Sequence, residues 1–362
     1  MQLRQLLLTP DPSTKRLVWV DNAKAALIVL VVIGHFGALA GPLKTIIYAF
    51  HLPAFLFLTG FMLSADLGKT SLVDFLQKYI FPYARLYLFM SAISIAFWWL
   101  VKIHSPERLD LIVSAIGQSL YGTQTATNRF LHDNGPLWYL PFLVSSLLLL
   151  YSVARLPLLL QAGAIIGAYI FTTQYEGPRL LWALDAAGVG LIFIALGQAF
   201  KRSLTGRVGD LSFIPWMLPV SIVISSVGLV LVAYINGRTN INIMSFGNNA
   251  VTYLIAAIFG TISVSGLCLL VPQTRLANLL STHSLLIFCI HIYAVKSLRG
   301  FLGGMTTLEK QALVFALGLS IAIGCALISI VVTPWLDRYV LLRGKRKSRL
   351  QPSVKTRSAS TP

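Results

Sequence analysis

Charge is scarce in this chain. Only 11% of its 362 residues are charged, whereas soluble domains average about 25%. Acidic residues are the rarer kind, with 12 Asp and Glu against 29 Lys and Arg. This scarcity excludes an ordinary soluble enzyme. We attribute the net charge of +17 to contact with an anionic membrane surface and not with nucleic acid.

Cysteine is scarce as well. Cys268, Cys289 and Cys325 are dispersed through apolar stretches, which excludes a disulfide framework and a metal cluster, so we expect packing residues. Residues 1–16 lack the continuous apolar run and cleavage site of a signal peptide, and we expect them to remain in the mature chain. Neither an internal repeat nor a soluble segment large enough for its own site is visible. Any chemistry is therefore expected among the membrane helices.

Long apolar runs dominate what is present. Hydrophobic residues make up 56% of the chain, in stretches such as "LIVLVVIG" and "SSLLLLYSV" that do not alternate with polar residues. Several approach the ~20 residues that a helix needs to cross the hydrocarbon core, and none shows the period of two of a barrel strand. The predicted fold is all-α, a polytopic integral membrane bundle of about ten transmembrane helices. These are expected near residues 20–41, 45–65, 81–101, 137–153, 157–173, 180–200, 213–234, 250–271, 283–298 and 309–335.

The pattern of basic residues sets the expected orientation. Lys and Arg gather on the side of the membrane that holds both termini, with eight of them from Arg338 onward, which predicts cytoplasmic termini. We expect a membrane domain over residues 1–340 and a basic tail over 341–362, whose Ser, Pro and Thr content predicts disorder. The longest loop, 102–136, has a mildly amphipathic middle that we expect along the outer interface.

Ionisable side chains at membrane depth are costly and usually functional. Lys24 and His35 are eleven residues apart, so a helix places them on one face within ~20° of each other and ~16 Å apart along its axis. Asp21, three residues before Lys24, is expected to form an ion pair with it and orient its ammonium group.

A second group of polar residues follows at a similar depth. The next predicted helix runs in the opposite direction, which brings His51 to the level of His35. Pro53 removes a backbone donor beside His51, and Gly60 permits close packing. His291 lies near the middle of a later span. A single buried histidine can simply bond a neighbouring helix, and we expect a structural role for Asp185, but the pair His35 and His51 with Lys24 favours function.

Several motifs resemble those of the acyltransferase-3 superfamily of membrane acyltransferases. "RLVWVDNAKAALIVLVVIGH" and "FHLPAFLFLTGF" are similar in spacing and order to its first two helices. "FPYARLYL" resembles its basic entry to the third helix, "GPLWYLPFLV" its L-W-F/Y-L-P helix, and "SLLIFCIH" a late helix ending in histidine. "DNAK" is closer to the branch of fucose 4-O-acetylases and exopolysaccharide acetylases, such as those that decorate xanthan-type gums. Where the family often has several arginines before the third helix, this chain offers Lys78 and Arg85.

The resemblance implies a function and a location. It implies transfer of an acetyl group from acetyl-CoA, without a metal, to a sugar hydroxyl of a bacterial exopolysaccharide or its lipid-linked precursor. It also implies the inner membrane, contact with membrane lipids and a possible polysaccharide synthesis or export complex as partner. Lys24 and His35 match the family's basic-x10-histidine motif.

A mechanism assigns roles to individual residues. His35 is the expected general base, which takes the proton of the attacking hydroxyl, with His51 or a nearby amide as donor to the oxyanion. With Lys24 and Asp21 these form the candidate catalytic set. Residues expected to contact the coenzyme A phosphates are Lys78, Arg85, Arg202 and Arg207. Residues expected to face the acceptor are His132, Asp133, Asn134, Trp138 and His291.

Two other functions fit the composition. A transporter of a glycan or another polar solute also places polar residues near the middle of many helices. A non-catalytic membrane partner of a polysaccharide synthesis complex would leave the histidine pair unexplained.

Overall fold

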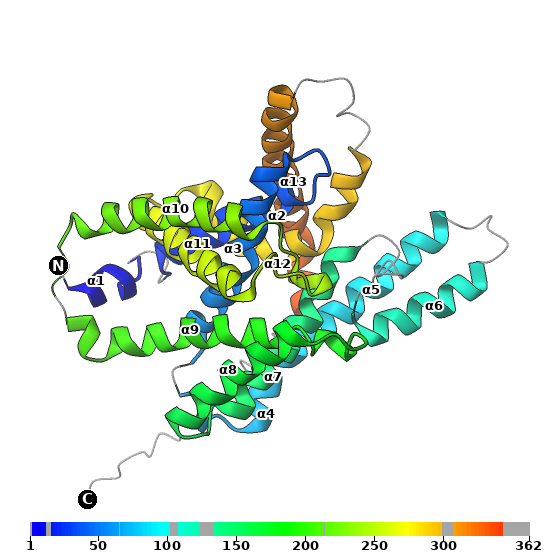
Figure 1. Cartoon of the computed structure of the whole chain (residues 1–362). Coiled ribbons are helices and arrows are strands. Elements are labelled where there is room, and N and C mark those ends of the chain that lie inside the picture. The colour runs from blue at the N-terminus through cyan, green and yellow to red at the C-terminus, as the bar shows by residue number, and fades with distance from the viewer. Residues whose placement is uncertain are drawn as a thin grey trace, which may run out of the picture.

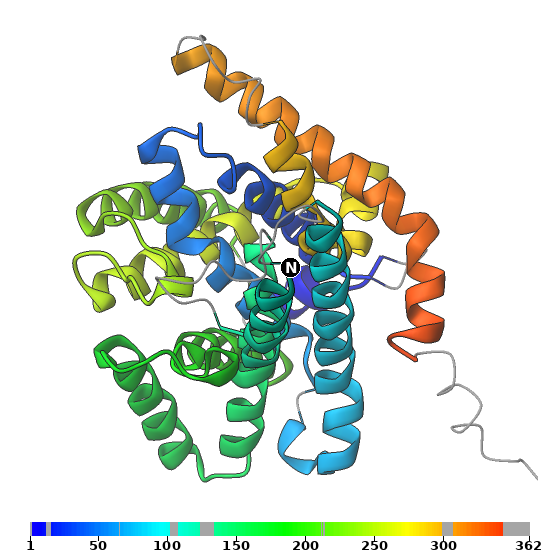
Figure 2. The same ribbon diagram turned by 90° about the vertical axis from the view of Figure 1, so that its right-hand side faces the viewer.

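The computed structural model describes residues 2–11, 16–64, 66–101, 108–123, 134–210, 212, 214–298 and 307–342. These residues form a bundle of helices (Figures 1 and 2). The helices are α1 (Leu3–Leu8), α2 (Val18–Gly34), α3 (Gly41–Met62), α4 (Leu72–Phe75), α5 (Phe81–Val101), α6 (Arg108–Tyr121), α7 (Tyr139–Val153), α8 (Leu158–Gln174), α9 (Ala187–Thr205), α10 (Met217–Asn236), α11 (Ala250–Leu270), α12 (Arg275–Ser297) and α13 (Thr307–Tyr339). A π-helical turn, Leu76–Ile80, joins α4 to α5.

Eight of the described segments are long and apolar enough to cross a membrane. The other two predicted spans are present as the 17-residue helices α2 and α8. The all-α polytopic bundle expected from the sequence is therefore confirmed. The basic tail lies almost wholly outside the described residues.

Some helix ends differ from the prediction. The first predicted span, α2, ends at Gly34 and not near residue 41. The next helix, α3, begins at Gly41 with Pro42 in its first turn. Proline fits the first turn of a helix because the N–H that it lacks has no partner there. α12 begins two turns earlier than expected, where the side chain of Thr274 accepts the backbone N–H of Ala277.

The amphipathic middle of the long loop forms α6. This helix runs back beside α5 (Figure 1), and the hydroxyl of Tyr87 donates to the carbonyl of Ser119, 2.6 Å away.

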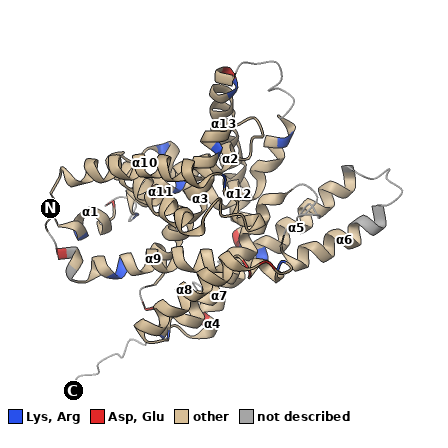
Figure 3. Cartoon of the chain, viewed as in Figure 1, with Lys and Arg blue, Asp and Glu red and all other residues tan. Residues whose placement is uncertain are grey.

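α2 occupies the centre of the bundle. It packs against α3, α11, α12 and α13, and Ala23, Leu27 and Val32 on it are fully buried. A helix enclosed by protein on all sides can hold polar side chains that lipid would not tolerate. Charged residues elsewhere lie mostly toward helix ends (Figure 3).

The ends of the helices form two faces. On the basal face, which we define by the start of α2 and α12 and the ends of α3, α9 and α11, Lys201 Nζ donates to Leu63 O and Asn22 Nδ2 to Val271 O. On the distal face, defined by the end of α2, the start of α3 and α13, and the loop between α10 and α11, Ala40 N donates to Gln311 Oε1. The faces alternate along the chain, as successive membrane crossings require.

Candidate active site

Three histidines come together where α2 ends. His291 Nε2 on α12 lies 3.4 Å from His35 Nδ1, and the two ring centroids are 4.9 Å apart. His51 on α3 interacts electrostatically with His35. His51 and His291 are buried, and His35 is half-buried. We call these three residues the histidine cluster.

The end of α2 presents His35 to the cluster. The backbone N–H of His35 bonds Val32 and Ile33, so the carbonyl of Val31 is left for the His35 ring, whose Nδ1 is 2.7 Å away. Tyr48 on α3 joins the two helices here: its hydroxyl donates to Gly34 O at 3.3 Å, and its ring centroid lies 5.1 Å from that of His51. The break after Gly34 therefore brings both histidines to one level, as the sequence predicted.

Backbone carbonyls fix the tautomers of the cluster. A carbonyl oxygen can only accept, so a ring nitrogen facing one carries the proton. His51 Nδ1 faces Ile47 O at 2.6 Å, and His35 Nδ1 faces Val31 O at 2.7 Å. In their neutral forms both rings therefore present Nε2 as a lone pair, which suits a proton acceptor.

The tautomer of His51 corrects its expected role. A neutral His51 has its one N–H committed to Ile47 O and has none to donate to an oxyanion, so the expected oxyanion donor must be another group. Tyrosine hydroxyls can donate, and Tyr83 and Tyr139 are among the residues that line the nearby cavity.

His291 has no spare nitrogen for a substrate. Its Nδ1 faces the carbonyls of Ile287 and Phe288 at 3.1 and 2.9 Å, and its Nε2 faces His35. The side chain is fully buried. The structure thus places His291 behind His35 and not at an acceptor surface.

A cavity of about 320 Å³ lies near the cluster, and its wall contains neighbours of the histidines and not the histidines themselves. It reaches Leu52, the residue after His51, and Phe288, whose ring centroid is 6.1 Å from that of His291. From there it extends toward Lys24 and Thr59. The polar side chains in its wall are Lys24, Thr59, Tyr83, Tyr139, Thr282 and Ser284. It is a partly polar space that extends from Lys24 toward the level of the histidines.

The expected ion pair between Asp21 and Lys24 is replaced by another. Arg16 Nε lies 2.6 Å from Asp21 Oδ2, and the hydroxyl of Ser281 donates to Asp21 Oδ1 at 2.6 Å. Arg16 also donates to Thr282 at 2.8 Å. A guanidinium satisfies a carboxylate through two parallel bonds, which a lysine cannot do, so Lys24 is left facing the cavity.

Arg16 is the residue that sequence reasoning missed as a site residue. Its signal was its position five residues before Asp21, at the start of the motif that resembles the family. Tyr48, Tyr83 and Tyr139 gave no such signal, because only the fold brings them to the cluster and the cavity.

Of the other residues expected to face the acceptor, two are buried in the bundle and two lie outside the described residues. Asn134 is fully buried, and its Nδ2 donates to Ser94 Oγ and Cys289 O at 3.2 and 3.0 Å. Trp138 is buried against the Phe142 ring. His132 and Asp133 lie outside the described residues. Asp185 is fully buried in an ion pair with Arg179, the structural role expected of it.

The expected phosphate contacts are on the basal side. Lys78 stacks on the Tyr79 ring at 4.8 Å and Arg85 on Phe81 at 5.4 Å. Arg202 is in the last turn of α9, while the side chain of Arg207 lies outside the described part. The helix that carries Lys78 also leads to Tyr83 in the cavity wall.

Metal ligands do not cluster in the described part of the chain, where no three His, Cys, Asp or Glu side chains gather around one point. The three cysteines are free and buried, which fits packing residues.

The helical bundle and the histidine cluster define a polytopic membrane protein with a histidine site inside the bundle. The sequence model of the acyltransferase-3 family, an acyltransferase domain, matches residues 17–333. The chain belongs to this family and is a membrane acyltransferase. No curated protein and no solved structure gives a significant match.

Proposed function

We propose that this protein transfers an acetyl group from acetyl-CoA to a sugar hydroxyl of a bacterial exopolysaccharide or its lipid-linked precursor, with His35 as general base. One observation carries the proposal: the histidine cluster, in which His35 Nδ1 faces Val31 O, lies next to residues that line a partly polar cavity reaching Lys24. The resemblance to fucose 4-O-acetylases and exopolysaccharide acetylases supports the choice of acceptor.

The chemistry needs a base, because a sugar hydroxyl is a poor nucleophile at neutral pH. His35 Nε2 takes the hydroxyl proton as the oxygen attacks the thioester carbonyl. The tetrahedral oxyanion accepts hydrogen bonds from Tyr83 or Tyr139 in the cavity wall, a dry setting where such bonds are strong. Collapse of this intermediate breaks the C–S bond, and the proton held by His35 passes to the departing thiolate.

The donor enters from the basal side in this mechanism. Coenzyme A is made in the cytoplasm and carries several phosphates, so the basal cations Lys78, Arg85, Arg202 and Arg207 are its proposed partners. The long, mostly uncharged pantetheine arm fits the cavity between Lys24 and the histidine cluster.

The acceptor approaches from the distal side. There Tyr48 lies against His51, Lys44 Nζ is 5.6 Å from the centroid of the Tyr48 ring, and the exposed Arg238 interacts electrostatically with Tyr48. These polar groups are the proposed acceptor contacts, in place of the buried Asn134 and Trp138.

The test is acetyl transfer by the purified protein in lipid vesicles. Radiolabelled acetyl-CoA and a lipid-linked saccharide are supplied, and labelled glycan is measured. Because His35→Ala removes the base, we expect a loss of at least about a hundredfold, the lower end of what general base catalysis contributes.

His283→Ala is the matched control, because it removes another histidine of α12 whose ring lies near Thr333 and outside the cluster. We expect it to keep wild-type activity. Label transfer that survives His35→Ala would refute the assigned base, and wild-type protein without any transfer would refute the acetyltransferase.

A further inference from the structure

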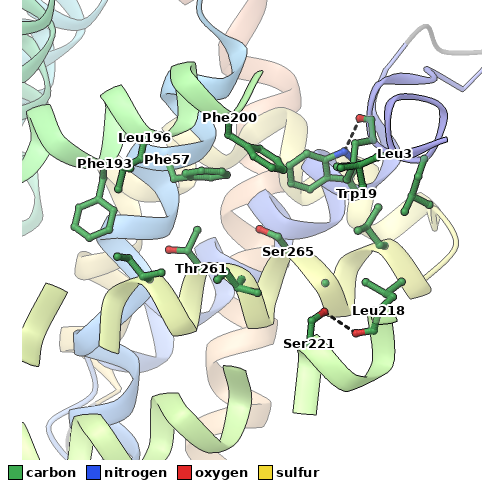
Figure 4. Close-up of a pocket in the computed structure, with 16 residues that line it drawn as sticks. Leu3, Trp19, Phe57, Phe193, Leu196, Phe200, Leu218, Ser221, Thr261 and Ser265 are labelled. Carbon is green, nitrogen blue, oxygen red and sulfur yellow. Dashed lines mark hydrogen bonds between the residues drawn. The ribbon is translucent and has the colours of Figure 1, made fainter. Parts of the chain in front are cut away.

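Figure 4 shows a second cavity, of about 420 Å³. It lies on the other side of α3 from the first cavity. α3 separates the two, because Phe57 faces this cavity while Phe55 and Thr59 face the polar one. Its other walls come from α9, α10 and α11, and α1 lies across one end. The two spaces are therefore separate.

The lining of this cavity is hydrocarbon. Side chains such as Phe57, Phe193, Phe200 and Leu218 surround it (Figure 4). Three hydroxyls are also in the wall. Those of Ser221 and Thr261 are bonded to carbonyls of their own helices, and that of Ser265 is buried without a hydrogen-bond partner. A cavity with so few polar groups does not hold ordered water.

The cavity opens sideways into the lipid. Leu196 on α9 and Ile262 on α11 both line it, yet their side chains are 40% and 45% exposed. These residues belong to two helices of membrane-spanning length, so the opening faces the hydrocarbon core. Its wall follows α11 from Ile258 to Leu269, a rise of ~16 Å, about half the thickness of that core.

α1 closes the basal end. Its residues Leu3, Leu6 and Leu7 enter the lining, and Trp19 Nε1 donates to Leu7 O at 2.9 Å (Figure 4). Arg4 Nε donates to Leu204 O at 3.1 Å, which holds α1 to the end of α9. The space is thus a blind apolar slot, entered from the side, with its shut end at one membrane surface.

Basic residues lie at the shut end. Arg4 is on α1 and Arg202 is in the last turn of α9, and among the described side chains there Asp210 pairs with Arg4 at 3.5 Å. An excess of positive charge at this depth attracts an anionic headgroup.

We propose that this slot binds one hydrocarbon chain of an anionic phospholipid, taken from the membrane leaflet at the basal face. The chain lies along α11, and the headgroup sits beside α1 and the basic end of α9. α3 keeps the headgroup away from the histidine cluster, so the bound lipid is a structural component and not the acceptor. The proposal does not depend on acetyl transfer.

Native mass spectrometry of the full-length protein tests the proposal. The protein is extracted into detergent, stripped of lipid, and given phosphatidylglycerol, phosphatidylcholine or a polyprenyl phosphate. We expect wild-type protein to retain one phosphatidylglycerol and to unfold at a higher temperature with it. Equal retention of phosphatidylcholine, preferential retention of the polyprenyl phosphate, or no retained lipid would each overturn it.

Filling the slot gives the decisive comparison. Ser265→Phe on α11 and Leu196→Trp on α9 place bulk into the slot from two walls, and each should abolish retention and the thermal shift. Ile255→Phe introduces the same side chain on α11 at a site that is 42% exposed, and should leave both unchanged. Filled variants that fold and still retain the phospholipid would refute the assigned site.

Discussion

A histidine whose ring faces a carbonyl of its own helix has one tautomer available, and this determines what the cluster can do. His35 and His51 both hold Nδ1 against a carbonyl one turn back. His35 is half-buried and His51 fully buried, so a hydroxyl reaches His35 more readily. The arrangement explains why two histidines at one level need not share one role.

His291 is a positioning residue for His35 under the proposed mechanism. Its Nε2 lone pair faces His35 Nδ1, where it stabilises the N–H of the imidazolium that forms when His35 takes a proton. We expect His291→Ala to lower kcat about tenfold, the size of a hydrogen bond worth roughly 1.5 kcal/mol, with little change in the KM for acetyl-CoA.

A double-mutant cycle separates this role from a purely structural one. In the His35→Ala background, His291→Ala should cost nothing further, because it acts through the removed ring. His291→Gln keeps an acceptor near the Nε2 position and should recover part of kcat. An equal loss from His291→Ala in both backgrounds would mean that it only supports the fold.

At the scale of the helices, α3 and α9 approach so closely that only glycine fits between them. A Cβ atom on Gly60 would overlap the backbone of Ile194, and one on Gly197 would overlap that of Phe57. We expect Gly60→Ala to destabilise the protein by about 1–3 kcal/mol, the usual cost of overpacking, seen as a lower midpoint of thermal unfolding in detergent.

Gly324→Ala is the control for this substitution. Gly324 is also helical, on α13, but a Cβ there meets no atom within 4 Å. Alanine favours a helix by up to about 1 kcal/mol over glycine, so its midpoint should stay or rise. A midpoint unchanged by Gly60→Ala would show that α3 and α9 can separate at low cost.

The sequence predicted the helices better than it predicted the candidate active site. Apolar runs predicted the helices, because the length and composition of a membrane-spanning helix are local properties of the sequence. The sequence did not predict the end of α2 at Gly34. Residues 35–40 are mostly apolar, so they read as a continuation of the membrane helix. The pairing of Asp21 with Arg16 and the place of His291 behind His35 depend on how α12 packs against α2, which no local pattern records.

At the scale of the whole molecule, the proposed mechanism brings acetyl-CoA from the basal face and the acceptor from the distal face. These two faces must then lie on opposite sides of the membrane. The proposed orientation places the basal face, with Arg16, Lys201 and Arg202, in the cytoplasm, in accord with the bias of basic residues toward that side. Lys69 follows the end of α3 on the basal side, and Arg238 lies in the loop between α10 and α11 on the distal side. Both are exposed.

Cysteine labelling tests this orientation in whole cells. The native cysteines are buried, so a membrane-impermeant maleimide should reach only an introduced thiol. We expect Arg238→Cys to react in intact cells and Lys69→Cys only after the membrane that holds the protein is opened, because a charged reagent cannot cross the hydrocarbon core. The unsubstituted protein gives the background. If Lys69→Cys reacts in intact cells and Arg238→Cys does not, the orientation is the opposite of the proposed one and acetyl-CoA would reach the wrong face. If both sites react in intact cells, the two faces do not lie on opposite sides of the membrane.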